Sequence, residues 1–296
     1  FLAAVQKYIV DVGVVIEIMD RMLNQDRNTV KSFGDEWSRM NQSNLSEIER
    51  KKIFNDYFLI FPFNLIGKDS IGFDMGCGSG RWAAIMAPLV KRLFCIDASS
   101  EAIKVARENL KSFDNINYQI SSVNETGLDS DLFDFGYSLG VLHHLPNTSA
   151  AITSCAMLLK KGSPFLLYLY YSFDNKPLWY KLVWQISELV RGVVNKLPPA
   201  LKMKLTDLLA IIIYLPLSRI AFLFEKAGFN VDNFPLSYYK DKSFYTMRTD
   251  SRDRFGTPLE KRFSKIEIKQ MMEKAGFKNV KFSEFKPYWV VVGSKG

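Results

Sequence analysis

The chain has 296 residues, of which 48% are hydrophobic and 24% charged, so it can bury one large core or a core with a smaller domain. Three widely spaced cysteines and two adjacent histidines predict neither a disulfide framework nor a metal site. Residues 1–171 carry a net charge of −2 and residues 172–296 one of +10. Because no concentrated Arg-rich tract is present, we expect no nucleic-acid partner. An acidic substrate, a phosphate-bearing carrier, an anionic membrane surface and a solvated basic face remain open.

Residues 1–61 predict an N-terminal helical arm. The apolar stretch 1–19 is interrupted by three charged residues and lacks the basic start of a signal peptide, which favours an amphipathic helix. This first helical segment is expected to end near residue 28, and a polar stretch separates it from a second helix over 45–61. Between them, Phe33 and Trp37 either help to close a site or pack the arm onto the core.

A glycine turn follows the first predicted strand. The apolar run that begins at Ile71 ends in an acid, Asp74, and then has glycines at 76, 78 and 80. Glycine allows the backbone to approach a ligand closely, and the helix expected over 81–87 places free N–H groups at the same turn. Strand, turn and helix N-terminus together predict a cofactor site.

Alternating strands and helices continue to about residue 171. A second strand over 93–97 ends in Asp97, 23 residues after Asp74 and close to the offset expected of a ribose-binding acid. A third strand leads to Ser122, and a fourth contains Ser138 and is followed by His143 and His144. A fifth strand covers 164–171, and this order predicts a parallel sheet with ligands at the carboxyl ends of its strands.

The motifs at 71–80, 93–99 and 133–147 resemble those of the class I S-adenosylmethionine-dependent methyltransferases, with a core similar to the ubiquinone and menaquinone C-methylating enzymes. The resemblance implies an α/β, Rossmann-like sheet of seven mostly parallel strands, and S-adenosyl-L-methionine as the cofactor. Ser122 departs from the family, which usually has an acid there for the adenine amino group. The cofactor-binding positions that the resemblance implies are Asp74, Gly76, Cys77, Gly78, Ser79, Gly80, Asp97, Ala98, Ser99, Ser122, Val123 and Ser138.

The predicted core comprises residues 62–171 and 262–296, interrupted by an insert over 172–261. The insert looks helical and broken by prolines at 198, 199 and 216, and its apolar run 208–217 is too short to span a bilayer. We expect it to form a helical cap for the substrate, with a membrane interface as the alternative. A capped helix over 264–277 and two further strands, over 280–283 and 288–293, complete the core.

The predicted function is methyl transfer to a small or carrier-linked acceptor, and the layout resembles an uncharacterised bacterial subgroup associated with surface-glycan or lipid-linked metabolism. His144 and His143 are candidates for a base or an acceptor contact, or else for a helix cap or core position. Tyr171, Arg248 and Arg254 are candidates for substrate binding, although Arg/Asp pairing within the fold is an alternative. We expect a cytoplasmic protein, with contact to the inner face of the membrane left open.

Two competing functions belong to other classes. One is a non-catalytic binding module that keeps the cofactor fold and docks through its basic insert. The other is a nicotinamide dehydrogenase, which the glycine spacing disfavours because the dinucleotide fingerprint is G-x-G-x-x-G.

Overall fold

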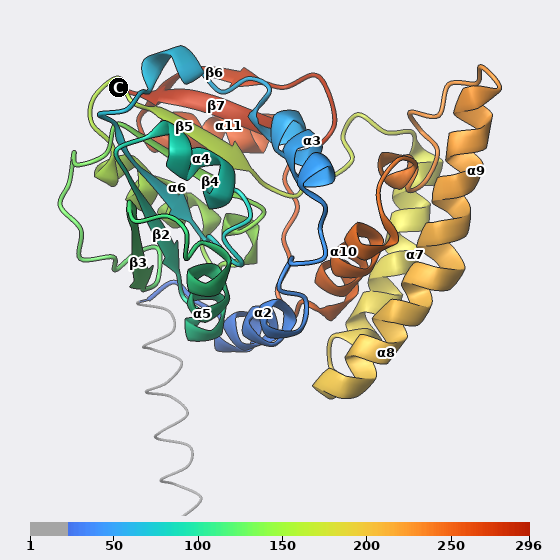
Figure 1. Ribbon diagram of the computed structural model, residues 1–296. Helices are drawn as coiled ribbons and strands as arrows, with labels where there is room; N and C mark the ends of the chain where they lie inside the picture. The colour runs from blue at the N-terminus through green and yellow to red at the C-terminus, as the bar shows by residue number, and fades with distance from the viewer. Residues whose placement is uncertain (1–22) are drawn as a thin grey trace, which may run out of the picture.

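The structure is a computed structural model that describes residues 23–296, so the helix expected over residues 1–19 lies outside the described residues. Seven strands form one sheet in the order β3-β2-β1-β4-β5-β7-β6 (Figure 1). Strands β1 to β5 are parallel, and β7 runs antiparallel to both β5 and β6. The seven-stranded, mostly parallel α/β sheet expected from the sequence is therefore confirmed. The strands are β1 Ile71–Met75, β2 Arg92–Asp97, β3 Ile116–Ile120, β4 Phe135–Leu139, β5 Pro164–Tyr168, β6 Phe277–Phe282 and β7 Val290–Lys295.

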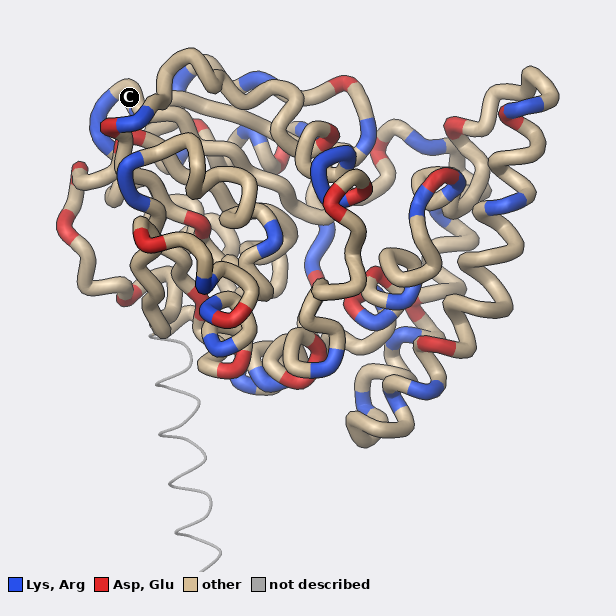
Figure 2. The backbone as a smooth tube through the Cα atoms, viewed as in Figure 1, with Lys and Arg blue, Asp and Glu red and all other residues tan. Residues whose placement is uncertain are grey.

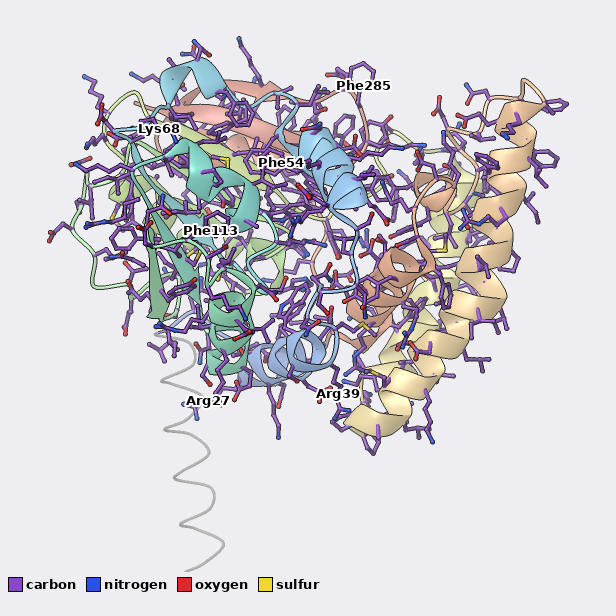
Figure 3. The ribbon with its side chains drawn as sticks, in the orientation of Figure 1. Arg27, Arg39, Phe54, Lys68, Phe113 and Phe285 are labelled. Carbon is purple, nitrogen blue, oxygen red and sulfur yellow. The ribbon has the colours of Figure 1, made fainter. Side chains whose placement is uncertain are left out.

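Helices cover both faces of the sheet, because the central strands carry apolar side chains on both sides. One face packs against α3 (Glu47–Phe58), α4 (Ala83–Met86) and α5 (Ser100–Asn109), and the other against α6 (Thr148–Leu158) and α11 (Lys265–Lys274). On the first face, Phe54 of α3 lies beside Trp82, with ring centroids 6.4 Å apart (Figure 3). A capping box formed by Ser264 and Glu267 begins α11 as the sequence predicted.

The register between β1 and β4 follows from two glycine–phenylalanine pairs. Gly72 lies opposite Phe135, and Phe73 lies opposite Gly136. A Cβ atom added to Gly72 would lie 2.0 Å from Phe135 Cζ, and one added to Gly136 would lie 2.3 Å from Phe73 Cζ. Each phenyl ring therefore occupies the space that the opposite glycine leaves, which allows the two central strands to bury large rings on both faces.

The arm departs from the sequence expectation of a break near residue 28. Helix α2 runs over Arg27–Arg39, starts at the cap residue Asp26, and packs against α5 and α10. Gly34 lies in its middle, and a Cβ atom there would lie 2.8 Å from Ser99 Oγ. The glycine weakens the helix locally but lets it approach α5 closely. At the same helix, Arg252 Nη2 of α10 donates to Asp35 Oδ2 over 3.0 Å, and Arg252 is buried.

The insert contains helices α7 (Leu178–Val194), α8 (Pro199–Leu209), α9 (Leu215–Lys226) and α10 (Phe244–Gly256), which lie together beside the sheet (Figure 1). A small apolar cluster of their own holds them together, made of Val194, Leu209, Tyr214, Met247 and Phe255. All four helices fall within residues 172–261. The boundaries of the predicted division into arm, core and insert stay a prediction.

Proline 216 does not break the insert, contrary to the sequence expectation. Residues Pro199–Lys226 form one helical stretch of 28 residues, long and apolar enough by length and composition to cross a membrane, which taken alone is weak evidence that it does so. A π-helical turn over Ala210–Tyr214 precedes Pro216, the second residue of α9. A π-helical turn can accommodate a proline, which lacks an N–H donor. In such a turn the i→i−4 hydrogen-bond pattern of the α-helix is already interrupted.

Candidate active site

The glycine turn after β1 has left-handed backbone geometry that side chains resist. The φ angles of Gly76, Gly78 and Gly80 are +79°, +53° and +77°. A Cβ atom at Gly76 would lie 2.4 Å from Val141 Cγ1 and one at Gly78 would lie 3.0 Å from Trp37 Cε2. The turn is thus enclosed by the loop after β4 on one side and by helix α2 on the other, and only glycine fits between them.

Asp97, at the end of β2, holds the glycine turn through its carboxylate. Its Oδ2 accepts from the Gly78 N–H over 2.9 Å, and its Oδ1 accepts from the Ser99 N–H over 2.9 Å. Burial raises the pKa of Asp97, and the N–H groups of Ser99 and Gly78 act in the opposite direction. Since each carboxylate oxygen has a second lone pair, Asp97 can still accept hydrogen bonds from a ligand.

Three of the predicted cofactor residues lie behind the turn rather than beside the cavity described below. Asp74 is buried, and its Oδ2 has no hydrogen-bond partner among the described residues. Burial, together with the charge of Asp97, raises the pKa of Asp74 to about 8. Ser138 Oγ donates to the Met75 carbonyl over 2.8 Å, and Gly80 faces Leu110 on the other side of the loop. These residues support the turn and do not line the cavity.

A cavity of about 600 Å³ opens above the turn and extends to the helices of the insert. Ser122 Oγ and Ser79 Oγ, which are buried near its wall, lack hydrogen-bond partners among residues 23–296. Orphaned buried hydroxyls of this kind indicate that a polar ligand completes the site. The predicted cofactor residues that line the cavity are Gly76, Cys77, Gly78, Ser79, Asp97, Ala98, Ser99, Ser122 and Val123.

His144 lies on the wall of this cavity beyond the end of β4. Its Nδ1 is 2.7 Å from the Leu259 carbonyl oxygen. Since a carbonyl can only accept, we assign the proton of a neutral ring to Nδ1, which leaves Nε2 with a free lone pair. Nε2 has no hydrogen-bond partner in the described part of the chain, and Phe33 packs edge-on against the ring at 4.9 Å between centroids.

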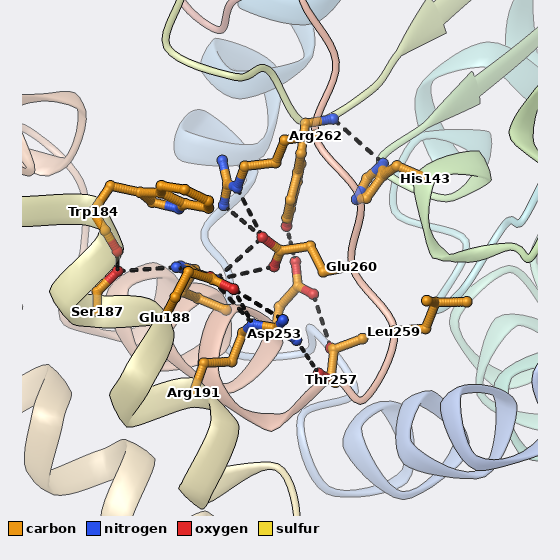
Figure 4. A network of polar contacts seen from close by, with 12 residues as sticks. His143, Trp184, Ser187, Glu188, Arg191, Asp253, Thr257, Leu259, Glu260 and Arg262 are labelled. Carbon is orange, nitrogen blue, oxygen red and sulfur yellow. Dashed lines mark hydrogen bonds and ion pairs between the residues drawn. The ribbon is translucent and has the colours of Figure 1, made fainter. Parts of the chain in front are cut away.

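A carboxylate from the insert stands next to this histidine. Asp253 Oδ1 of α10 is 3.8 Å from His144 Nε2, and Asp253 also accepts hydrogen bonds from the Tyr170 hydroxyl and from Thr257 Oγ1 (Figure 4). Burial raises the pKa of Asp253, and His144 opposes that shift. Nearby, burial raises the pKa of Asp250 to about 6. The far end of the cavity therefore combines one imidazole with two carboxyl groups.

Residues 73–167 match the family model described as a methyltransferase domain. The chain contains a class I S-adenosylmethionine-dependent methyltransferase domain. The ubiquinone biosynthesis O-methyltransferase of Xanthomonas oryzae pv. oryzae is 35% identical to it over 96 residues, which are 32% of this chain and 40% of that protein. The enzyme of the same name from Xanthomonas campestris pv. campestris matches over the same shares. The chain thus spans two fifths of the length of these relatives.

Solved structures resemble the methyltransferase domain and its surroundings in fold alone. An S-adenosylmethionine-dependent methyltransferase from Thermotoga maritima is 15% identical, with a TM-score of 0.41 over 89% of this chain and 100% of that chain. A Haemonchus contortus phosphoethanolamine N-methyltransferase is 18% identical, with a TM-score of 0.42 over 51% and 34%.

The cofactor of this methyltransferase domain is S-adenosylmethionine, and the residues present fit it. The turn residues Gly76, Cys77, Gly78 and Ser79 line the cavity, and Asp97 offers acceptors for the ribose hydroxyls. The unpartnered hydroxyl of Ser122 stands where the family has an acid, so it can contact adenine in its place. Both rings of α2 line the cavity, Trp37 against the glycine turn and Phe33 against His144, so of the two alternatives for these rings the structure favours a part in closing the site.

The other predicted site residues are distributed unevenly with respect to the cavity. His143 is buried away from the cavity and stacks on Tyr170 at 3.9 Å between ring centroids, and burial lowers its pKa well below the usual value. The ring therefore packs within the core and does not reach the cavity, which argues against a role as the base. Tyr171 does line the cavity beside the insert.

The two arginine candidates differ in the same way. Arg248 is not brought to the cavity, because Asp207 holds it through Nε at 2.8 Å and Nη2 at 2.6 Å, which is the structural pairing that the sequence left as an alternative. Arg254 lines the cavity, yet its guanidinium is bound by Glu188 and by Glu260 (Figure 4). Its charge is compensated within the protein, so it shapes the wall rather than offering a free cation.

Asp253 was not singled out as a site residue by the sequence, whereas Tyr170 was noted only for its place near the end of the fifth predicted strand. The only signal for Asp253 was position, since it lies in the Arg/Asp-rich segment before the sheet resumes. Their meeting at His144 depends on a contact between residues 109 positions apart, which no local pattern encodes.

Proposed function

We propose that the protein transfers a methyl group from S-adenosylmethionine to a small or carrier-linked acceptor bound between the sheet and the insert. The observation that supports this proposal is the single cavity that joins the glycine turn to His144 and the insert helices. In this proposal the turn, Asp97 and Ser122 hold the donor, while His144 and Tyr171 face the acceptor. The match to ubiquinone biosynthesis O-methyltransferases supports a hydroxyl as the acceptor group.

The sulfonium cofactor, when bound, supplies an electrophilic methyl group. The protein then has to align the acceptor, exclude water and, for a hydroxyl, remove its proton. In our proposal His144 Nε2 takes this proton, because its lone pair is free and Nδ1 is anchored on the Leu259 carbonyl. Asp253, 3.8 Å away, stabilises the imidazolium that results.

Calorimetry with S-adenosylhomocysteine tests the donor site. We expect Asp97→Ala to weaken binding about 10- to 100-fold, because two charge-assisted hydrogen bonds to the ribose and the brace of the turn are lost together. The matched control is Asp134→Ala, which removes a carboxylate that bonds the Ile71 N–H outside the cavity and pairs with Lys160. Unchanged affinity in Asp97→Ala, or no binding to the wild-type protein, would contradict the donor site.

The acceptor side is tested by methyl transfer from a radiolabelled donor to a panel of hydroxyl, amine and thiol compounds. For a hydroxyl acceptor, His144→Asn should lower the rate by about 10²- to 10⁴-fold while leaving S-adenosylhomocysteine binding intact. Donor binding without transfer to any compound, in the wild-type protein, would favour the non-catalytic binding module instead.

A further inference from the structure

The helix pair formed by α7 and by the long helix of α8 and α9 carries an apolar surface that faces away from the protein. We call it the outer face. On α7 its exposed large residues recur at helical spacing: Leu178, Trp179, Leu182, Val183, Ile186, Leu189, Val190 and Val193. On the long helix they are Leu201, Leu208, Ile211, Ile212, Ile213, Ile220, Leu223 and Phe224. A patch built from so many large side chains is rare on soluble monomers and indicates an interaction surface.

The polarity of α7 is inverted with respect to an ordinary surface helix. Two of its three charged residues point inward, where Glu188 binds Arg254 and Arg191 donates to the Thr257 carbonyl over 3.1 Å (Figure 4). Its apolar stripe points outward, and Leu189 is 74% exposed. A helix in contact with water alone buries its apolar stripe, so this arrangement is expected of a helix that meets a second apolar phase.

Basic side chains frame the outer face. Lys196 lies at the turn between α7 and α8, Lys204 lies within α8, and Lys181 lies near the opposite end of α7. None of these three forms an ion pair within residues 23–296, whereas the acids of the helix pair are all engaged. Figure 2 shows the long helix as mostly tan, with blue and red positions spaced along it. Unpaired lysines around an apolar face match a surface that is apolar inside and anionic outside.

We propose that the outer face docks on an anionic phospholipid bilayer. The long helix lies along that surface and does not span it, because its other side is buried against the insert through Leu209, Tyr214, Ser218 and Ala221. Its 28 residues extend about 42 Å at 1.5 Å per residue, so the contact is broad.

Docking also places the entrance of the cavity at the lipid surface. Val183, Ile186 and Val190 of α7 and Ile213 of the long helix belong both to the outer face and to the wall of the cavity. If the proposed methyl transfer holds, on which this step rests, the acceptor is an amphiphile whose apolar part stays near these side chains while its polar group reaches His144.

Co-sedimentation with vesicles tests the docking independently of the donor. We expect the wild-type protein to bind vesicles of phosphatidylcholine with 30% phosphatidylglycerol, and to bind more weakly at 0.5 M than at 0.1 M salt. The variant Leu189→Glu/Ile212→Glu changes two exposed residues that do not line the cavity and should bind about a hundredfold more weakly, at roughly tenfold per buried aliphatic side chain. The control Ile48→Glu/Ile266→Glu alters equally exposed residues of α3 and α11 and should bind as the wild type does.

Trp179 reports the depth of contact. It lies on the outer face, so vesicles with acyl chains brominated near the headgroup should quench the wild-type fluorescence, and this quenching should largely disappear in Trp179→Phe.

Absence of vesicle binding, or equal binding of the two double variants, would overturn the proposal. A concentration-dependent dimer that Leu189→Glu/Ile212→Glu abolishes, without vesicle binding, would assign the face to a second copy of the chain. S-adenosylhomocysteine binding is measured in parallel. Vesicle binding without S-adenosylhomocysteine binding refutes the methyl-transfer proposal alone. S-adenosylhomocysteine binding without vesicle binding refutes the docking alone.

Discussion

Asp74 is expected to make the protein less stable as the pH rises, and Asp74→Asn should remove this dependence. Its carboxyl group titrates near pH 4 in the unfolded chain, whereas burial raises the pKa to about 8 in the folded protein. Between these values the folded state holds a proton that the unfolded state has released. The free energy of unfolding therefore falls as the pH rises from about 4 to 8, and it levels off above that range.

The size of the effect follows from the roughly four units between the two pKa values. At about 1.4 kcal/mol per unit, the loss is at most about 6 kcal/mol in total, of which about 4 kcal/mol falls between pH 5 and pH 8.5. Local rearrangement and water entry around the buried carboxylate reduce it, so we expect a measured loss of about 2–4 kcal/mol from this residue.

Urea unfolding of the wild type and of Asp74→Asn at several pH values measures this contribution, since titration of all other groups is common to both proteins. The neutral amide should leave stability within about 1 kcal/mol of the wild type at pH 5 and raise it above the wild type at pH 8.5. Asp134→Asn, at a half-exposed carboxylate paired with Lys160, serves as the control and should not gain stability at high pH. A constant difference between wild type and Asp74→Asn from pH 5 to pH 8.5 would refute the reasoning.

Three further predictions concern the turn and the packing of the arm. Gly76→Ala should destabilise the protein by more than about 2 kcal/mol in thermal or urea unfolding, because the new methyl group meets Val141; Gly162→Ala, with φ of +85° and open space, should cost only the backbone strain of about 1 kcal/mol, and equal losses would contradict the role of the clash. Arg252→Leu should cost about 3 kcal/mol in the same assay by breaking the buried ion pair between α10 and α2, and a neutral result would mean that the pair adds nothing to stability. Trp37→Ala should weaken S-adenosylhomocysteine binding about tenfold in calorimetry, and unchanged affinity would show that the ring does not cover the donor.

Local patterns were sufficient for the core of the fold and for the glycine turn that lines the cavity. Each strand, its terminal acid or hydroxyl and the glycine turn are encoded within about ten residues, so Asp97, Gly78 and Ser122 could be placed before their neighbours were known. The match of residues 73–167 to the methyltransferase family agrees with this reading.

The acceptor side could not be predicted in the same way, because it depends on contacts between distant segments. His143 and His144 are adjacent in sequence, yet only His144 reaches the cavity, since the short helical turn after β4 directs the two rings differently. Arg248 and Arg254 lie in the same polar segment of the sequence. Their positions in the structure differ because Arg248 pairs with Asp207, whereas Arg254 pairs with Glu188 and Glu260.

The long helix was missed for a different reason. Proline ordinarily ends a helix, and a single sequence gives no sign that a π turn will accommodate Pro216. The exposed apolar surface that results is a property of the whole insert rather than of any one motif.

Helix α2 touches both ends of the cavity, which links two events that could otherwise be separate. Its Trp37 lies against the donor turn, and its Asp35 is tied to α10, the helix that carries Asp253. A displacement of α2 away from the turn would therefore act on the attachment of α10 as well. If the proposed methyl transfer holds, S-adenosylhomocysteine and the methylated acceptor would leave in one common opening of the arm.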